Sequence, residues 1–283
     1  MHIPDGILPA QVSAVGYAIA APLIGYSLRR IERQSHQHPA GVAQTIPKAA
    51  LLTATFFVAS SLYLPCPPPL GTVHFLMNGL LGAVLGYYAI PAIVIGLLFQ
   101  ALLLGHGGLT TLGLNTLLLG IPALLAYHLF QGRHWFVSKV RFRKAIPLQM
   151  VYGVFGGLAG FIGVMGAALL FFALVIWTIP ADMNAATEQA AISLMTLINV
   201  PLAVLEGIFT ASFVVFIFRT KPELLEVDAL RGQRARGQQA ANGEWSVPTD
   251  DSLETMSLSS SAHSRPLEAA GKTGDPPHRT GQG

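Results

Sequence analysis

Long apolar runs are the feature that most constrains the fold of this 283-residue chain. A helix that crosses a membrane needs about 20 mostly apolar residues, and the first 218 positions contain several stretches of this kind. The composition agrees, because 52% of the residues are hydrophobic and only 11% are charged. The sequence therefore predicts one all-α membrane domain, a polytopic helix bundle.

Polar residues, prolines and glycines divide the apolar sequence into about seven predicted transmembrane helices. These lie near residues 10–28, 46–64, 73–90, 91–104, 109–130, 148–178 and 191–218. The run from Thr72 to Leu104 is the weakest point of this count, because Pro91 divides it and its second part is short for a full crossing. A kinked or partly re-entrant pair is the alternative there.

The positions of lysine and arginine predict the orientation of the bundle, because these residues concentrate in cytoplasmic loops. They flank the connections after the first, fifth and seventh predicted helices. Seven helices with the N-terminus outside place all of them, and the C-terminus, on the cytoplasmic side, whereas six helices would break the pattern. The formal net charge of +3 thus indicates orientation in the inner membrane and not nucleic-acid binding. The residues are Arg29, Arg30, Arg33, Lys48, Arg133, Lys139, Arg141, Arg143, Lys144, Arg219 and Lys221.

Both ends of the chain have a distinct composition. The amino terminus, MHIPDGILPA, lacks the basic start of a cleavable signal peptide, so we expect Met1 to remain on the protein. From about Glu223 the sequence is polar, with too few apolar residues to bury enough surface to fold. We predict a membrane substrate-binding domain over 1–218 and a disordered cytoplasmic tail over 219–283.

His2 is the residue that points most directly to a chemistry. The amine of Met1, the deprotonated backbone amide of His2 and the His2 imidazole can chelate one metal ion through three nitrogens. The fused rings hold these donors near one plane and leave one in-plane position, which suits Ni(II) or Cu(II). His74 could fill that position. A histidine at position two by chance is the alternative interpretation.

Four polar residues, His74 among them, lie on the predicted outer side or within the helices. His74 follows a proline-rich loop, and Asn78 lies one turn further along the same helix face, where it either pairs with another helix or orients a ligand. His106 lies in the glycine-rich stretch GHGGLTTLGLNT. Glu206 is the one acid in the body of the last predicted helix, where an acid is costly and usually functional or paired.

Four blocks of the sequence resemble a known family. In chain order they are MHIPDGIL, GTVHFLMNGLLGAVLGYYA, QALLLGHGGLTTLGLNT and NVPLAVLEGIFTA. Together they are similar to the CbiM/NikM-type substrate-capture subunits of energy-coupling-factor cobalt and nickel importers. The resemblance covers residues 1 to about 218, and the polar tail matches nothing in it.

The resemblance implies a near-square-planar Co(II) or Ni(II) site formed by the Met1 amine, the His2 amide and imidazole, and the His74 imidazole. It also implies that Asn78 and His106 belong to the surrounding shell. The implied partners are a scaffold membrane subunit, two cytoplasmic ATPases and often a small accessory membrane subunit. Because this sequence has no GxxxxGK[ST] phosphate-binding loop, ATP hydrolysis is expected of the partners, and this chain is expected not to be an enzyme. The metal is the transported substrate and no tightly held cofactor is expected.

Two other functions remain as alternatives. An intramembrane metalloenzyme such as a zinc protease would need an HExxH motif or a three-ligand site with a nearby acid, and the sequence has no such motif. A secondary metal transporter could use Glu206 for proton coupling without ATPases. Residue types do not separate cobalt from nickel, because both accept nitrogen donors. Cobalt would supply cobamide synthesis, and nickel would supply nickel enzymes.

Overall fold

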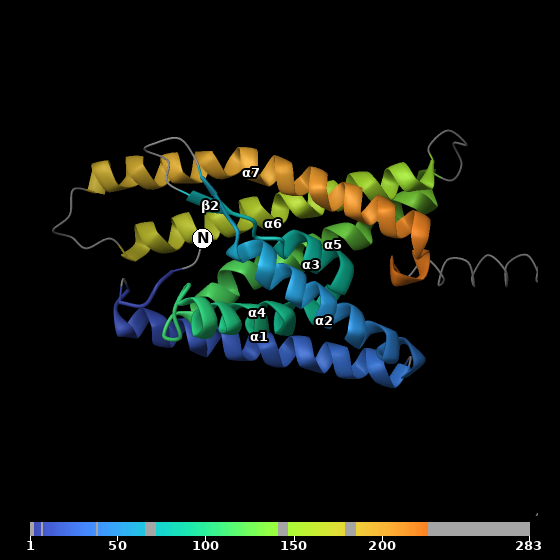
Figure 1. The fold of residues 1–283 in the computed structure, drawn as a ribbon, viewed down its shortest axis with the longest axis horizontal. Helices are drawn as coiled ribbons and strands as arrows, with labels where there is room; N and C mark the ends of the chain where they lie inside the picture. The colour runs from blue at the N-terminus through green and yellow to red at the C-terminus, as the bar shows by residue number, and fades with distance from the viewer. Residues whose placement is uncertain are drawn as a thin grey trace, which may run out of the picture. The chain divides into compact units, whose positions relative to one another are not determined.

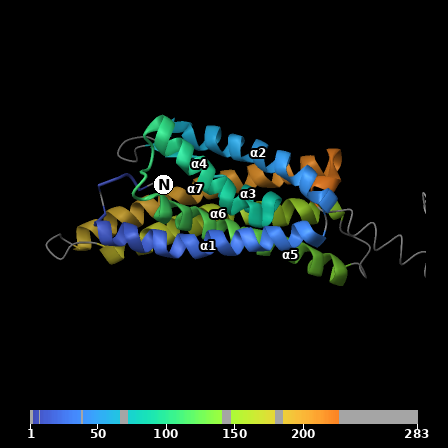
Figure 2. The ribbon, with the colours of Figure 1, turned by 90° about the horizontal axis from the view of Figure 1, so that it is seen from below.

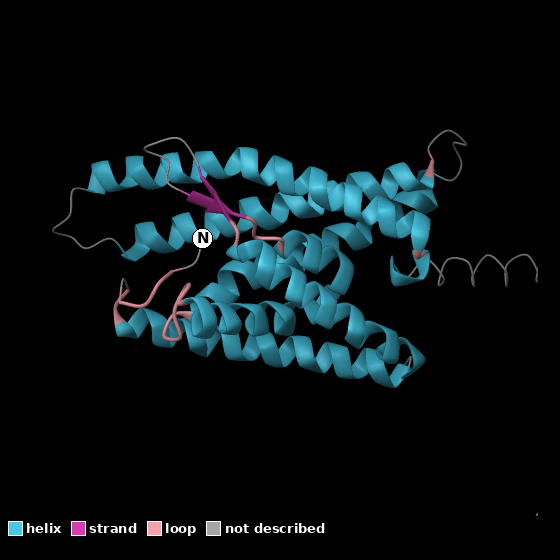
Figure 3. Ribbon diagram, viewed as in Figure 1, coloured by secondary structure: helices cyan, strands magenta, loops and turns pink. Residues whose placement is uncertain are grey.

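The computed structural model describes residues 3–6, 8–37, 39–65, 72–140, 147–178 and 185–225 (Figures 1 and 3). The chain divides into two compact units, Met1–Val227 and Asp228–Gly283, and the second lies outside the described residues. The elements of the first unit are α1 (Ala10–Gln37), α2 (Pro39–Ser61), β1 (Tyr63–Pro65), β2 (Thr72–His74), α3 (Asn78–Leu85), the 3-10 helix η1 (Gly86–Tyr88), α4 (Ala89–Leu104), α5 (Leu112–Val140), α6 (Leu148–Thr178), α7 (Ala185–Thr220) and the 3-10 helix η2 (Pro222–Leu225).

Long apolar helices make up most of this unit. Among the described residues, five helical segments are long and apolar enough to cross a membrane, and α3 with α4 counts as one of them. Helices α6 and α7 lie side by side, and α1 packs against α5 (Figures 1 and 2). The prediction of a helical, multi-pass membrane bundle is confirmed. The count of seven crossings and the outside N-terminus stay predictions.

Helix α3 begins in the middle of the bundle. The side-chain amide of Asn78, its first residue, donates to the carbonyl of Leu119 in α5 at 3.2 Å and to that of Gly163 in α6 at 2.9 Å. Both carbonyls lie well inside long helices. Extended chain, which includes the antiparallel pair β1 and β2, leads to this point. The predicted helix over 73–90 is therefore extended chain in its first part and helix only from Asn78.

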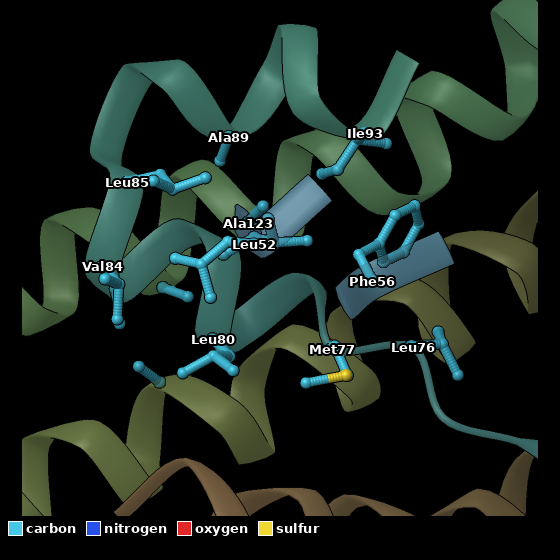
Figure 4. Packing of buried hydrophobic residues seen from close by; sticks show 14 of the residues in the cluster. Leu52, Phe56, Leu76, Met77, Leu80, Val84, Leu85, Ala89, Ile93 and Ala123 are labelled. Carbon is cyan, nitrogen blue, oxygen red and sulfur yellow. The ribbon is translucent and has the colours of Figure 1, made fainter. Parts of the chain in front are cut away.

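Helix α4 runs back in the direction from which α3 came. Near the end of α3, the Val84 carbonyl accepts a hydrogen bond at 3.2 Å from Lys48, which belongs to the first half of α2. Near the end of α4, the side chain of Gln100 donates to Ser60, at the opposite end of α2. Figure 4 shows the reversal: the chain runs from Met77 to Leu85, turns, and runs back from Ala89 past Ile93. Because the chain reverses here, α3 and α4 do not form one straight crossing despite their joint length, and the re-entrant pair stays a prediction.

The break between α3 and α4 falls at η1, not at Pro91 as predicted. Gly86 adopts φ 60° and ψ −125°, a conformation that favours glycine and that ends α3. Pro91 lies in the first turn of α4. Proline has no backbone N–H, and in the first turn this group would have no acceptor within the helix. The proline therefore fits the start of a helix, and glycine supplies the turn.

The basic residues of distant helices meet at one end of the unit. Lys48 donates to the Leu224 carbonyl at 3.1 Å, and Arg133, which is almost fully buried, donates to the Leu225 carbonyl at 3.1 Å. These bonds hold η2 against the bundle. The described structure includes residues 219–225 of the predicted tail, and the rest of that tail lies outside the described residues.

All eight residues of α3 are buried, and glycines allow its backbone to touch two other helices. A Cβ on Gly79 would lie 2.4 Å from the Ala159 carbonyl oxygen of α6, and one on Gly82 would lie 2.0 Å from the Ala123 carbonyl oxygen of α5. Small residues of this kind permit close helix packing in lipid. The position of α3, and of the chain that enters it, is therefore set by backbone contact.

We expect Gly82→Ala to destabilise the protein by about 1–3 kcal/mol, because the added methyl group meets backbone and not a side chain that could move. The measurement is the thermal denaturation midpoint in detergent. Gly25→Ala in α1 is the control, since nothing lies within 4 Å of its Cβ and alanine favours a helix. Equal midpoints for the two variants would contradict this packing.

Candidate metal site

Ile3 anchors the start of the chain to the beginning of α5. Its backbone N–H donates to the Asn115 side-chain oxygen at 2.9 Å, and its carbonyl accepts from the Asn115 amide at 3.1 Å and from the Thr111 hydroxyl at 2.6 Å. The Ile3 side chain is only 3% exposed. Both backbone polar groups of this residue are thus paired inside the protein, as buried backbone requires.

Asp5 adds a second attachment to the loop between α4 and α5. Its carboxylate accepts from the backbone N–H of Leu109 at 3.2 Å and of Thr110 at 3.0 Å, and also from the Thr110 hydroxyl. That side-chain hydrogen bond is the main reason that the pKa of Asp5 lies below its ordinary value. A Cβ on Gly108 would overlap the carboxylate, so the glycine leaves the space that Asp5 occupies.

His106 lies in the same loop. Its backbone N–H donates to the Gln100 carbonyl at 3.1 Å, which closes the end of α4, and Gly105 and Gly107 on either side have positive φ angles of 63° and 72°. The loop that carries the predicted residue His106 is therefore the loop to which the amino-terminal segment is attached.

His74 is the last residue of β2, where it pairs with Tyr63 of β1. The side chain is half-buried, and burial lowers the pKa of His74 to about 3. The imidazole is consequently neutral at physiological pH, which is the protonation state that binds a metal.

Glu206 is paired with backbone N–H groups, which the sequence could not show. This side chain, 2% exposed in α7, accepts hydrogen bonds from the backbone N–H groups of Leu76 and of Met77, the latter at 2.8 Å. Met77 has a φ of 47°, and no other described residue except glycine has a positive φ. The acid therefore holds an irregular piece of backbone immediately after His74.

Asn78 has its polar atoms engaged within the protein. Besides the two carbonyls of α5 and α6, it accepts a hydrogen bond at 3.0 Å from the N–H of Gly79. The sequence left two roles open for Asn78, pairing with another helix or orienting a ligand. These contacts are those of a residue that pairs with other helices.

The structure thus places the predicted residues in two groups. His74, Asn78 and Glu206 belong to the junction of β2 and α3, while His106 belongs to the loop held by Asp5. Met1 and His2 lie outside the described residues, and the described residues contain no group of three or more histidine, cysteine, aspartate or glutamate side chains suited to a metal ion. Of the three predicted metal ligands, His74 is the one that lies within the described residues.

The sequence did not predict the contacts by which Asp5, Thr111 and Asn115 position the terminal segment. Each stands in a block that resembles the known family, but nothing local distinguishes it from a turn residue or a residue that caps a helix. Their pairing partners lie more than 100 positions away in the sequence.

The bundle of long apolar helices, with its amino-terminal segment folded onto a polar loop, defines a multi-pass membrane protein. A family model described as the cobalt uptake substrate-specific transmembrane region, CbiM, matches residues 2–224. The chain belongs to this family, which confirms the resemblance noted from its sequence blocks. Family membership makes the chain a membrane component of cobalt uptake.

Individual relatives agree with the family assignment. A cobalt transport protein CbiM of Clostridium tetani is 32% identical over 244 residues, which cover 83% of this chain and 90% of that protein. A cobalt transport protein CbiM of Geobacter sulfurreducens is 30% identical over 240 residues, covering 80% of this chain and 61% of that protein. A crystal structure described as a transition metal transporter shares the fold, with a TM-score of 0.58, 20% identity and coverage of 82% of this chain and all of that one.

We expect Asn115→Ala to loosen the amino-terminal segment without unfolding the bundle. The substitution leaves the buried Ile3 N–H without its acceptor, at a cost of about 1–3 kcal/mol. An added aminopeptidase should then remove terminal residues roughly tenfold faster, the factor that corresponds to about 1.4 kcal/mol, as followed by intact mass. Ser212→Ala, which removes a hydroxyl bonded to the carbonyl of Ile208 in its own helix, is the control and should leave the rate unchanged.

The Asp5 contact should also depend on pH. Because the pKa of Asp5 in the folded protein is lowered, its contribution is fully present above the ordinary value of 3.8 and is lost as the pH falls through the lowered value. The protection of the Leu109 and Thr110 amides against hydrogen exchange should follow the same course. Asp5→Asn should show low protection at every pH. Loss of wild-type protection already between pH 6 and 5 would mean that another group controls the contact.

Proposed function

We propose that this protein captures Co(II) or Ni(II) on the outer side of the membrane with the Met1 amine, the His2 amide and imidazole, and the His74 imidazole as ligands. The observation that carries the proposal is the set of hydrogen bonds that Asn115 and Thr111 make with the backbone of Ile3. Two residues reach at most about 7 Å, so a terminus held at Ile3 keeps the proposed Met1 and His2 donors within that distance of a buried, fixed point.

The chemistry of the donors supports a planar site. Three nitrogens from two consecutive residues form fused chelate rings in one plane, and His74 would supply the fourth in-plane donor. Because burial lowers the pKa of His74, the imidazole would bind the metal in its neutral form without first releasing a proton. Fixing the terminal segment and the His74 strand in advance also lowers the entropy lost when the ion binds.

Cobalt is the transported ion that we favour. The family is described as a cobalt uptake region, and the two relatives described above carry the name of cobalt transport proteins. Supply of cobalt to cobamide synthesis in the cell would follow. Nickel remains the second candidate because the proposed donor set suits it equally.

We further propose that transport requires partners and ATP. On the family resemblance, the partners are a scaffold membrane subunit, two cytoplasmic ATPases and a small accessory membrane subunit, all in the inner membrane. The end of the bundle where Lys48 and Arg133 hold η2 carries the basic residues expected on the cytoplasmic side, where ATPases would act. The chain itself would bind and release the ion and would catalyse no reaction.

The test is metal binding by the purified protein, with Ni(II) and Co(II) as the ions added. We expect one extra residue before Met1, or His2→Ala, to abolish tight binding, because each removes the terminal chelate. His74→Ala should weaken binding at least 10- to 100-fold, the loss that even an outer-shell partner of a metal ligand causes. His128→Ala, an exposed histidine that packs on Tyr127, is the control and should bind like wild type.

If binding survives both the terminal extension and His2→Ala, the Met1 amine and His2 are not the ligands, and the proposed chelate is refuted. Dependence on the partners is tested separately, by uptake of radioactive cobalt into cells that express this chain with and without the ATPases. Uptake that needs no ATPase and follows the proton gradient would favour a secondary transporter instead.

A further inference from the structure

Glu206 is a buried acid that the proposed chelate does not use. It lies in α7 within a segment long and apolar enough to span the membrane, where an ionisable side chain is costly unless it is paired or functional. Its carboxylate oxygens each accept one backbone hydrogen bond, from Leu76 and from Met77. The acid contacts the chain two and three residues after His74.

The two N–H groups that Glu206 accepts are ones that the local chain cannot satisfy. They precede α3, whose first residue is Asn78, so no helical turn before them offers a carbonyl. Met77 is in the left-handed region, which costs energy in any residue but glycine and persists only when its surroundings enforce it. The side chain of Glu206, at the start of α3, supplies both acceptors.

The carboxylate therefore determines the course of the chain between β2 and α3. On one side of this junction, α3 is immobilised by the backbone contacts of Gly79 and Gly82. On the other side, His74 is within about 7 Å of Leu76 along the chain. The pairing of His74 with Tyr63 fixes the strand itself, and the bonds to Glu206 orient the Leu76 and Met77 N–H groups, so that they set the path of the chain between His74 and α3.

We propose that Glu206 is a positioning residue of the metal site, which acts through the Leu76 and Met77 amides to present the His74 imidazole as the fourth ligand. This inference rests on the proposed function, since it gives Glu206 a task only if His74 binds the ion. It assigns the acid of α7 to metal capture without direct contact with the metal.

The test is a double-mutant cycle on Ni(II) binding by the full chain, with Glu206→Gln and His74→Ala. Glutamine keeps the size of the side chain but offers one carbonyl acceptor and places an NH2 group against the second N–H. We expect Glu206→Gln to weaken binding about tenfold or more in the wild-type background, and less than twofold in the His74→Ala background. The absorption spectrum of bound Ni(II) in Glu206→Gln should resemble that of His74→Ala, because in both the fourth nitrogen is lost.

Thr210→Val is the matched control, because Thr210 is also buried in α7 one turn away and packs against Gly160. It should leave affinity and spectrum unchanged in both backgrounds. If Glu206→Gln does not accumulate as folded protein, Glu206→Asp, which withdraws the carboxylate by one methylene, enters the same cycle. Failure of both variants to fold would assign Glu206 to the fold alone and overturn the inference.

Three results separate the possible failures. Wild-type affinity in Glu206→Gln, with His74→Ala impaired, would refute the inference and leave the proposed ligands intact. An equal loss in both backgrounds would mean that Glu206 supports the whole bundle and does not act through His74. Unchanged affinity in His74→Ala would overturn the proposed ligand set, and the role of Glu206 with it.

Discussion

Backbone polar groups at membrane depth must find partners inside the protein, because the hydrocarbon core offers none. Within the described residues, this constraint is hardest to meet where extended chain enters the bundle ahead of α3. Glu206 meets it by accepting from Leu76 and Met77, and the side-chain oxygen of Asn78 accepts from the N–H of Gly79 in the first turn of α3. These two side chains thus accept the backbone N–H groups of Leu76, Met77 and Gly79, where the irregular stretch after His74 meets α3.

The same constraint governs the amino-terminal segment. Asn115 and Thr111 pair with both backbone groups of Ile3, and Asp5 pairs with the amides of the loop that carries His106. Two segments without helical structure are thus held by specific side chains of the bundle. Rigid placement of this kind is what a metal site requires, since ligands fixed in advance lose little freedom when the ion arrives.

Glycine packing gives these contacts a stable base. Gly79 and Gly82 bring the backbone of α3 against α6 and α5, and a methyl group at either position would overlap a carbonyl oxygen. Because α3 cannot move without disturbing both neighbours, its N-terminus and the hydrogen bonds made there keep one position relative to α5 and α6. At the other end of α3, Lys48 joins the Val84 carbonyl to that of Leu224, so this short helix is held at both ends.

The sequence by itself determined that this chain is a helical membrane protein, where most of its helices lie and which family it belongs to, because apolar runs and blocks of residues are local patterns. His2 and His74 could also be selected, because their chemistry is that of metal ligands. Only the tertiary structure decided that the chain turns back at Gly86 and not at Pro91, that Glu206 pairs with Leu76, and that Asn115 holds Ile3. These pairs are separated by 130 and 112 positions, and local patterning shows which residues are buried but not which buried polar groups meet.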